Sequence, residues 1–310
     1  MPEGNARAAM HAPTTVIAAC LCGQLRTFVR HDLRRNIRSA MIDPVRRETD
    51  VFATISFNVT ASRWLDHAAM SSVRVDTVRD WLAEEFNVVE FATRDDPTIV
   101  NGITVHTPCL PLIVRHEELR KSKYRWVLRL RTDAAYDSML PPYSQWPLLD
   151  HHPHGTLYTT SCGPAVYDLT EMERRDGVCA RAKPLPPRYL PLWASEKDDP
   201  AFSHALGCVK DAWGLMDRPA ASIYFSKAAL ERAMFTEAPA QNFSCLPQAN
   251  WYHECGLGCA LHLQGVRVRV ISKLVRDGSG GLQVRMVRFY NEGQDRVEPP
   301  AATSVIQLWN

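Results

Sequence analysis

The sequence predicts an α/β fold, built on an open, mostly parallel twisted sheet with helices on both faces. Short apolar runs that end in turn residues alternate with amphipathic helical patterns in βαβαβ order. Residues 16–21 are apolar on both faces and are followed by Gly23, a pattern typical of a buried central strand. We expect a flexible tail over residues 1–13 and a single domain over residues 14–310.

The alternation of patterns gives each expected element a place along the chain. The expected strands are residues 16–21, 50–56, 88–92, 124–131, 156–161, 220–225, 266–271 and 283–289. The expected helices are residues 28–41, 76–86, 110–122, 227–234 and 254–264. Prolines recur through residues 141–200, so we expect mainly loops in that region.

Composition and charge exclude several classes of protein. The 310 residues are 45% hydrophobic and 23% charged, which is a globular composition with ample length for a core. Lys and Arg number 36 against 34 for Asp and Glu, so the chain lacks the basic excess of a non-specific nucleic-acid binder. The apolar stretch of residues 14–22 is about half the roughly 20 residues of a membrane span, and we expect no transmembrane segment.

The cysteines bear on the cellular compartment. Nine cysteines are an odd number, so at least one thiol lies outside any disulfide in a monomer, and a chain of this length does not need disulfides to fold. We therefore expect a reducing, cytoplasmic environment. The N-glycosylation triplets at Asn58 and Asn242 keep the lumen of the secretory pathway as the alternative.

The segment from Arg129 to Tyr136 is the most informative for function. A hydrophobic strand here ends in Asp133, and ligands of open α/β sheets bind at the carboxyl ends of the strands. A carboxylate there can hold a divalent cation that neutralises a diphosphate leaving group. The alternative is that Asp133 caps the turn that follows.

Arg129 and Arg131 lie on one face of this strand, because alternate residues of a strand point the same way. Two arginines on a buried strand need anionic partners. A nucleotide diphosphate would supply them, and so would Asp or Glu side chains, so the pattern leaves both possibilities open.

These motifs together resemble those of GT-A-type glycosyltransferase-like proteins, of the kind found in lipopolysaccharide synthesis (WavE-type) and in algae and large algal viruses. The motifs occur in the same order and span about residues 14–271. They are the Gly-Gln-Leu-Arg-Thr-Phe turn at 23–28, Asp-Val-Phe at 50–52, the strand 124–133 with its Arg-Thr-Asp ending, and Glu254 before a helix.

The resemblance implies a GT-A-like fold that holds a UDP- or GDP-sugar donor, often with Mn²⁺ or Mg²⁺. Residues 131–133 occupy the place of the Asp-x-Asp motif, in which Asp133 matches the second acidic residue and Arg131 replaces the first. The Arg131 guanidinium can itself neutralise phosphate through charge-assisted hydrogen bonds. Gly23 and Arg26 match the turn that faces the nucleotide in such proteins.

Two carboxylates are candidates for accepting a proton from the acceptor hydroxyl. Glu254, at the start of an expected helix, is the first choice, because the helix dipole favours its ionised form. The alternative is that Glu254 only stabilises that helix. Asp211, in an expected loop before the strand 220–225, is the second choice.

The sequence therefore predicts a glycosyltransferase that moves a hexosyl or pentosyl group to a hydroxyl of a glycan or other acceptor. The alternative from another class is a catalytically silent GT-A-like protein that binds nucleotide sugars or glycans, a reading that Arg131 favours. A zinc site of Cys255, Cys259 and His262 on one helical face is a further possibility, although packed thiols explain the same spacing.

Overall fold

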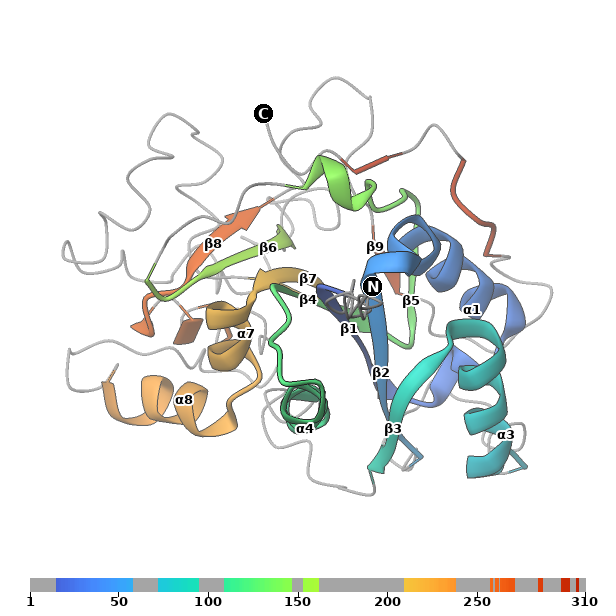
Figure 1. Ribbon diagram of the computed structural model, residues 1–310, viewed down its shortest axis with the longest axis horizontal. Coiled ribbons are helices and arrows are strands. Elements are labelled where there is room, and N and C mark those ends of the chain that lie inside the picture. The colour runs from blue at the N-terminus through green and yellow to red at the C-terminus, as the bar shows by residue number, and fades with distance from the viewer. Residues whose placement is uncertain are drawn as a thin grey trace, which may run out of the picture.

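The computed structural model describes residues 15–57, 72–94, 109–146, 153–161, 209–237, 257–258, 260–261, 263–270, 284–286, 297–301 and 305–306. Their centre is a seven-stranded sheet in the order β3-β2-β1-β4-β7-β6-β8 (Figure 1). Its strands are β1 (Ile17–Gln24), β2 (Thr49–Ser56), β3 (Val88–Arg94), β4 (Trp126–Arg131), β6 (Thr156–Ser161), β7 (Val209–Asp217) and β8 (Arg267–Val270). A separate two-stranded sheet pairs β5 (Ala134–Tyr136) with β9 (Val284–Met286).

The direction of the strands makes the large sheet mixed but mostly parallel. β1 pairs in parallel with β2 and β4, β2 with β3, and β6 with β8. β7 is antiparallel to both β4 and β6, so among the strands of this sheet it alone runs the opposite way. β2 and β3 lie on one side of β1, and the next strand of this sheet, β4, lies on the other side. The strand order therefore switches between β1 and β4.

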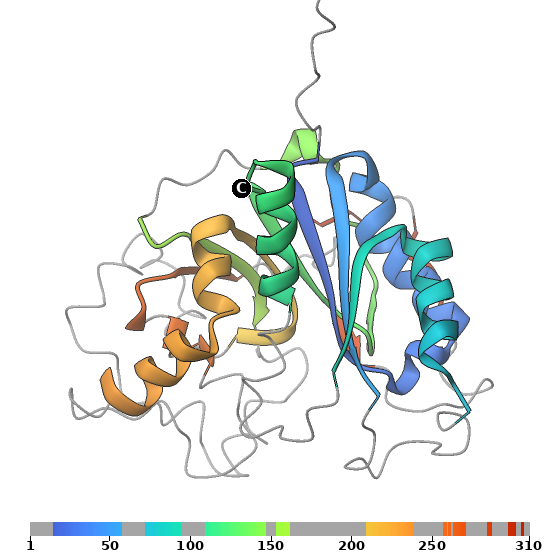
Figure 2. The same ribbon diagram turned by 60° about the horizontal axis from the view of Figure 1, so that its bottom comes forward.

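Helices cover both faces of the sheet (Figure 2). On one face lie α1 (His31–Ile37) and α3 (Val75–Trp81), whose Leu33 and Val78 join a core with Leu21 and Leu128. The other face carries α4 (Cys109–Arg120), α7 (Arg218–Tyr224) and α8 (Lys227–Arg232). Because strand side chains alternate, Ala18, Cys20 and Cys22 of β1 point to this second face and join its core.

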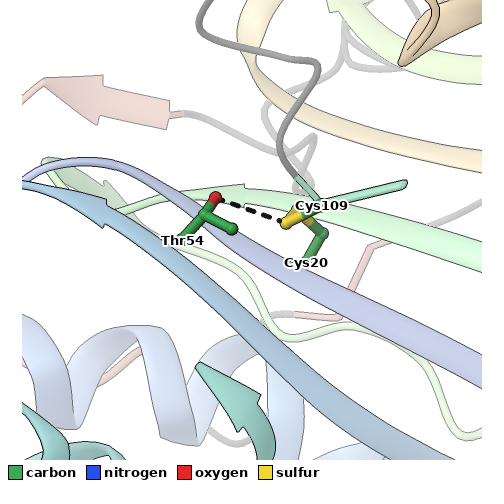
Figure 3. Close-up of a disulfide and its surroundings, with 3 residues drawn as sticks. All are labelled: Cys20, Thr54 and Cys109. Atoms are coloured by element: carbon green, nitrogen blue, oxygen red, sulfur yellow. Dashed lines mark hydrogen bonds between the residues drawn. A yellow bond between two sulfur atoms is a disulfide. The ribbon is translucent and has the colours of Figure 1, made fainter. Parts of the chain in front are cut away.

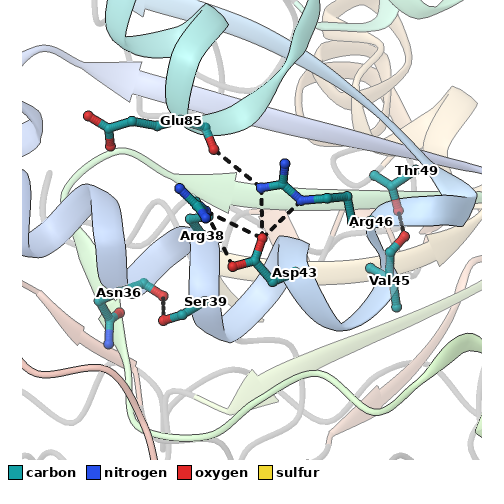
Figure 4. Close-up of polar contacts among 8 residues, drawn as sticks. All are labelled: Asn36, Arg38, Ser39, Asp43, Val45, Arg46, Thr49 and Glu85. Carbon is teal, nitrogen blue, oxygen red and sulfur yellow. Dashed lines mark hydrogen bonds and ion pairs between the residues drawn. The ribbon is translucent and has the colours of Figure 1, made fainter.

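Short 3-10 and π segments extend the helices and shape the connections. They are η1 (Arg26–Val29), η2 (Arg38–Ile42), η3 (Asp43–Glu48), η4 (Leu82–Phe86), η6 (Tyr143–Gln145) and η9 (Ala233–Glu237). Asp43 accepts hydrogen bonds from Arg38 and Arg46 where η2 meets η3 (Figure 4). These side chains are well exposed, so their ion pairs contribute little stability.

The predicted α/β class with a mostly parallel sheet is confirmed. Strands occur at 50–56, 88–92, 124–131, 156–161 and 266–271 within a few residues of the expected bounds, and β9 lies inside the expected strand 283–289. Helical segments occupy the expected ranges 28–41, 76–86, 110–122 and 227–234. The described residues of the expected helix 254–264 are helical at 257–258, 260–261 and 263.

Two local predictions are wrong. The sequence predicts a strand at residues 220–225, but residues 220–224 belong to α7. The Asp217 side chain accepts the Ala220 N–H at 3.0 Å, and Pro219 lies in the first turn, so both favour a helix start here. Asp211 was expected in a loop, but it lies on β7, whose Trp213 and Leu215 are fully buried. The apolar run of 212–216 thus forms the strand, and the helix begins immediately after it.

Several predictions fall outside the described residues. The tail of residues 1–13, most of the proline-rich region 141–200, and Glu254 are among them. In the part of the chain that the structure describes, no helix has the length and apolar character needed to cross a membrane. The single-domain organisation over residues 14–310 stays a prediction.

Candidate functional site

The carboxyl ends of β1 and β4 lie side by side where the strand order switches. Cys22 of β1 is the register partner of Arg131, the last residue of β4. The Thr132 hydroxyl donates a hydrogen bond of 2.7 Å to the Gln24 carbonyl and so closes the gap between the two strand ends. In open α/β sheets this switch point is where ligands bind.

Gly23 is required by this close approach. Its φ is +156°, and a Cβ atom added there would overlap the Oγ1 atom of Thr132. Thr132 is itself fully buried and has little room to retreat. Gly23 is therefore needed because Thr132, the residue that follows β4, packs directly against it.

The turn after β1 is fixed to the next strand. The Leu25 N–H donates to the Ser56 carbonyl at the end of β2, at 2.8 Å, and the Phe28 N–H returns to the Leu25 carbonyl at 2.7 Å. The backbone of Arg26 begins the short helix η1 at this edge. The Arg26 side chain is not among the described parts of the chain, so its predicted contact with the nucleotide stays a prediction.

Arg131 and Asp133 form a two-bond ion pair at this edge, which we call the carboxyl-edge pair. Nε of Arg131 donates to Oδ1 of Asp133 at 2.8 Å, and Nη2 donates to Oδ2 at 2.9 Å. The Asp133 side chain is 3% exposed, whereas that of Arg131 is 18% exposed. The carboxylate is thus buried beneath a guanidinium that has access to solvent.

Tyr136 contacts the backbone of the carboxyl-edge pair. Its hydroxyl oxygen accepts the Arg131 N–H at 3.3 Å, and Asn36 of α1 bonds both the N–H and the carbonyl of Tyr136, at 2.8 and 2.9 Å. Burial raises the pKa of Tyr136, although the neighbouring Arg131 N–H and arginine charges act against it, so the phenol is neutral. No sequence pattern marks Tyr136 or Asn36 as part of this site, and only the short spacing from Asp133 to Tyr136 points to the tyrosine.

Arg129 lies deeper in the same strand and is fully buried. It is the register partner of Cys20 on one side and of Gly214 on the other. It shares its face of the sheet with Val127, because alternate residues of a strand point the same way, and Val127 belongs to the core under α4 and α7. The sequence leaves two kinds of anionic partner open for these arginines, a nucleotide diphosphate and an acidic side chain. In the structure, the Asp133 side chain pairs with Arg131.

The reversed direction of β7 brings Asp211 to the same edge. The last pairing of β7 with β4 joins Trp213 to Leu130, and Asp211 lies two residues further toward the carboxyl ends of the parallel strands. Its backbone is therefore near the level of Thr132. Glu254, Cys255, Cys259 and His262 lie outside the described residues, so the structure does not test their roles.

A divalent cation does not fit the described environment of Asp133. Both carboxylate oxygens accept hydrogen bonds from the Arg131 guanidinium, whose positive charge opposes a second cation at the same oxygens. Mn²⁺ and Mg²⁺ also prefer several oxygen ligands. Among the described residues, the group with metal-ligand spacing is a cysteine cluster, Cys20, Cys22 and Cys109, which offers soft sulfur ligands instead.

Comparisons with known proteins add no identification. The chain matches no protein-family model, and no curated protein matches it either. Function must therefore be argued from the residues and their geometry.

Proposed function

We propose that this protein is a GT-A-like glycosyltransferase that moves a sugar from a nucleotide-sugar donor to a hydroxyl of a glycan or other acceptor. The observation that carries the proposal is the convergence of Gly23 and the carboxyl-edge pair at the switch between β1 and β4. The mostly parallel sheet, in which this edge is the ligand-binding one, supports it.

The donor diphosphate would bind to the Arg131 guanidinium. The ion pair with Asp133 uses Nε and Nη2, and it holds the planar group in one orientation at the edge of the sheet. A guanidinium carries five N–H bonds in a fixed fork and is suited to phosphate oxygens. Asp133 is then a positioning residue that aims Arg131, and Gly23 lets Thr132 at the end of β4 pack closely against β1.

This arrangement favours donor binding without a divalent cation. The Arg131 guanidinium would stand in for a metal at the leaving diphosphate, with Asp133 offsetting part of its positive charge. Each charge-assisted hydrogen bond to phosphate contributes on the order of 1.5–3 kcal/mol. The family resemblance implies dependence on Mn²⁺ or Mg²⁺, whereas binding through Arg131 predicts donor binding without either ion.

Transfer also needs a base for the acceptor. As the bond from the anomeric carbon to the diphosphate breaks, the acceptor oxygen bonds to that carbon and its proton passes to a carboxylate. Asp211 is a candidate because its strand reaches the same edge as Asp133. Glu254 remains the other candidate from the sequence, and either Asp211→Asn or Glu254→Gln should lower single-turnover transfer by roughly 10²–10⁴-fold.

The second candidate function is a silent protein that binds nucleotide sugars or glycans with no turnover. Arg131 takes the place of the first acidic residue of an Asp-x-Asp motif and pairs with Asp133, and this replacement favours a binding protein without turnover. Such a protein would bind the same donors and release intact sugar nucleotide after long incubation.

The proposal is tested by incubating the purified protein with UDP- and GDP-sugars, with and without glycan acceptors. Release of the nucleoside diphosphate is followed over hours. We expect turnover in the wild type and a loss of at least tenfold in Asp133→Asn, with no change in Asp80→Asn, an exposed aspartate on α3. Donor binding with no release would support the silent protein, and neither binding nor release would reject both functions.

A further inference from the structure

Three fully buried cysteines gather on the face of the sheet that α4 covers. Cys20 and Cys22 belong to β1, and Cys109 is the first residue of α4. A disulfide joins Cys20 to Cys109, which are 89 positions apart in sequence, with 6.0 Å between their Cα atoms (Figure 3). The nine cysteines predict a reducing environment, in which this bond is unexpected, and the cellular compartment stays a prediction.

Cys22 lies next to this bond without taking part in it. The sulfur atoms of Cys20, Cys22 and Cys109 all lie within 4.8 Å of one another. Cys22 keeps its thiol. A nucleophilic sulfur is therefore held beside a disulfide, which is the arrangement that thiol–disulfide exchange requires.

Geometry decides which bonds the three sulfurs can form. Cys20 and Cys22 are two residues apart on one face of a strand, so their Cβ atoms are separated by about 6.6 Å, well beyond the roughly 3.5–4.5 Å of a disulfide. Cys109 comes from another element and faces both. It is thus the shared partner, and the alternatives are a bond to Cys20 or a bond to Cys22.

A buried arginine and the start of a helix lie next to this cluster. Arg129, fully buried, is the register partner of Cys20, and parity places both on the face under α4. Cys109 stands at the N-terminus of a 12-residue helix, and its sulfur lies 3.6 Å from the Thr54 hydroxyl. Exchange needs a sulfur that can leave as a thiolate, and a cation or a helix N-terminus stabilises a thiolate, whereas burial among apolar side chains opposes it.

We propose that Cys20, Cys22 and Cys109 form a thiol–disulfide exchange site, in which Cys109 changes partner between Cys20 and Cys22. The Cys22 thiolate attacks the Cys109 sulfur, a bond forms between Cys22 and Cys109, and the Cys20 sulfur leaves with the electron pair of the old bond. The proton lost by Cys22 ends on Cys20. The step conserves the oxidation state, so no external oxidant or reductant is consumed.

The exchange moves the cross-link two residues along β1 toward Gly23. The N-terminus of α4 is then attached to Cys22, the register partner of Arg131, instead of to Cys20, the register partner of Arg129. The inference goes beyond the proposed transferase function, because it concerns these three sulfurs alone and can be tested with no ligand present.

The test is disulfide mapping of the full chain under non-reducing conditions, after an acid quench and alkylation of thiols. Cleavage after Leu21 separates Cys20 from Cys22, so the partner of Cys109 can be read by mass spectrometry. We expect the wild type to contain both the Cys20–Cys109 and the Cys22–Cys109 linkages, with their ratio reaching a steady value faster at pH 8 than at pH 6.

Two variants sharpen the result. With oxidised glutathione added as the oxidant, Cys20→Ser should form the Cys22–Cys109 bond, and Cys22→Ser should contain the Cys20–Cys109 bond alone. A melting curve is the control for folding. The proposal is overturned if wild-type Cys109 pairs with Cys20 only at both pH values, or if folded Cys20→Ser leaves Cys109 alkylated as a thiol. Should Cys20→Ser not fold, the wild-type mapping alone decides.

Discussion

The two ends of the central strands carry carboxylates that are bound in different ways. At the amino end, Oδ2 of Asp50 accepts hydrogen bonds from Thr15 at 2.9 Å, Arg120 at 3.1 Å and Tyr124 at 2.6 Å. These donors are 35 to 74 residues away in sequence, and we call the group the amino-edge clamp. At the carboxyl end, Asp133 is bound by Arg131, only two residues away.

This difference suits the amino-edge clamp to holding the fold together and the carboxyl-edge pair to binding a ligand. The amino-edge clamp ties the start of β2 to the end of α4 and to the segment before β4, and the Arg120 guanidinium also lies 4.4 Å above the Tyr124 ring. Removing any member loosens several elements. The carboxyl-edge pair joins two residues of one strand end, so it contributes less to the fold, and it holds the Arg131 guanidinium at the edge where a ligand would bind.

The largest effect on stability is expected from the amino-edge clamp. Asp50→Asn removes the charge that three donors share and leaves Arg120, whose side chain is 10% exposed, without its carboxylate. We expect a loss of about 3 kcal/mol in the free energy of unfolding, measured by urea denaturation. The matched control is Asp43→Asn, which breaks exposed ion pairs and should cost less than about 0.5 kcal/mol (Figure 4). Equal losses in the two variants would contradict the comparison.

Gly23→Ala tests the packing at the carboxyl edge. The new methyl group would have to displace Thr132 and break its bond to the Gln24 carbonyl. We expect a loss of roughly 1–3 kcal/mol, as for other overpacked sites, together with weaker donor binding. Thermal unfolding and nucleotide titration on one preparation measure both. Wild-type stability in this variant would show that the two strand ends are not in close contact.

The smallest effect concerns Asp32, which joins α1 to the C-terminal segment by accepting the Val297 N–H at 3.0 Å. Burial alone would raise its pKa, but the hydrogen bonds from Arg30, Val297 and Leu33 outweigh it, and the pKa lies below its usual value. Stability from this group is therefore present above about pH 4 and lost as pH falls through the lowered pKa. The difference in melting temperature between wild type and Asp32→Asn should shrink below pH 4, and a constant difference down to pH 2 would contradict it.

Sequence patterns were sufficient for the parallel half of the sheet. β1, β2 and β4 are short apolar runs buried on both faces, so their composition alone marks them. The antiparallel half was harder. The apolar run at 220–225 resembled a strand, and only the helix-start signals at Asp217 and Pro219 distinguished it.

The site was predictable in position but not in its pairings. The end of β4 could be recognised from an acidic residue after a hydrophobic strand, and the spacing allowed either a ligand or a side chain as the partner of Arg131. The choice depends on rotamers that no spacing specifies. The Cys20–Cys109 bond joins residues 89 apart, and such a pairing depends on tertiary structure.

The central claim is that Arg131 at the carboxyl edge binds the donor diphosphate without a metal. The most direct measurement is the stabilisation of wild type and Arg131→Ala by UDP and GDP, in chelator and in Mn²⁺. Ligand at 100 times its dissociation constant should stabilise the wild type by about 2.7 kcal/mol, equally with and without Mn²⁺, and Arg131→Ala should lose most of this gain. Stabilisation that appears only with Mn²⁺, or that survives in Arg131→Ala, would contradict the claim, and so would the absence of any stabilisation by either nucleotide.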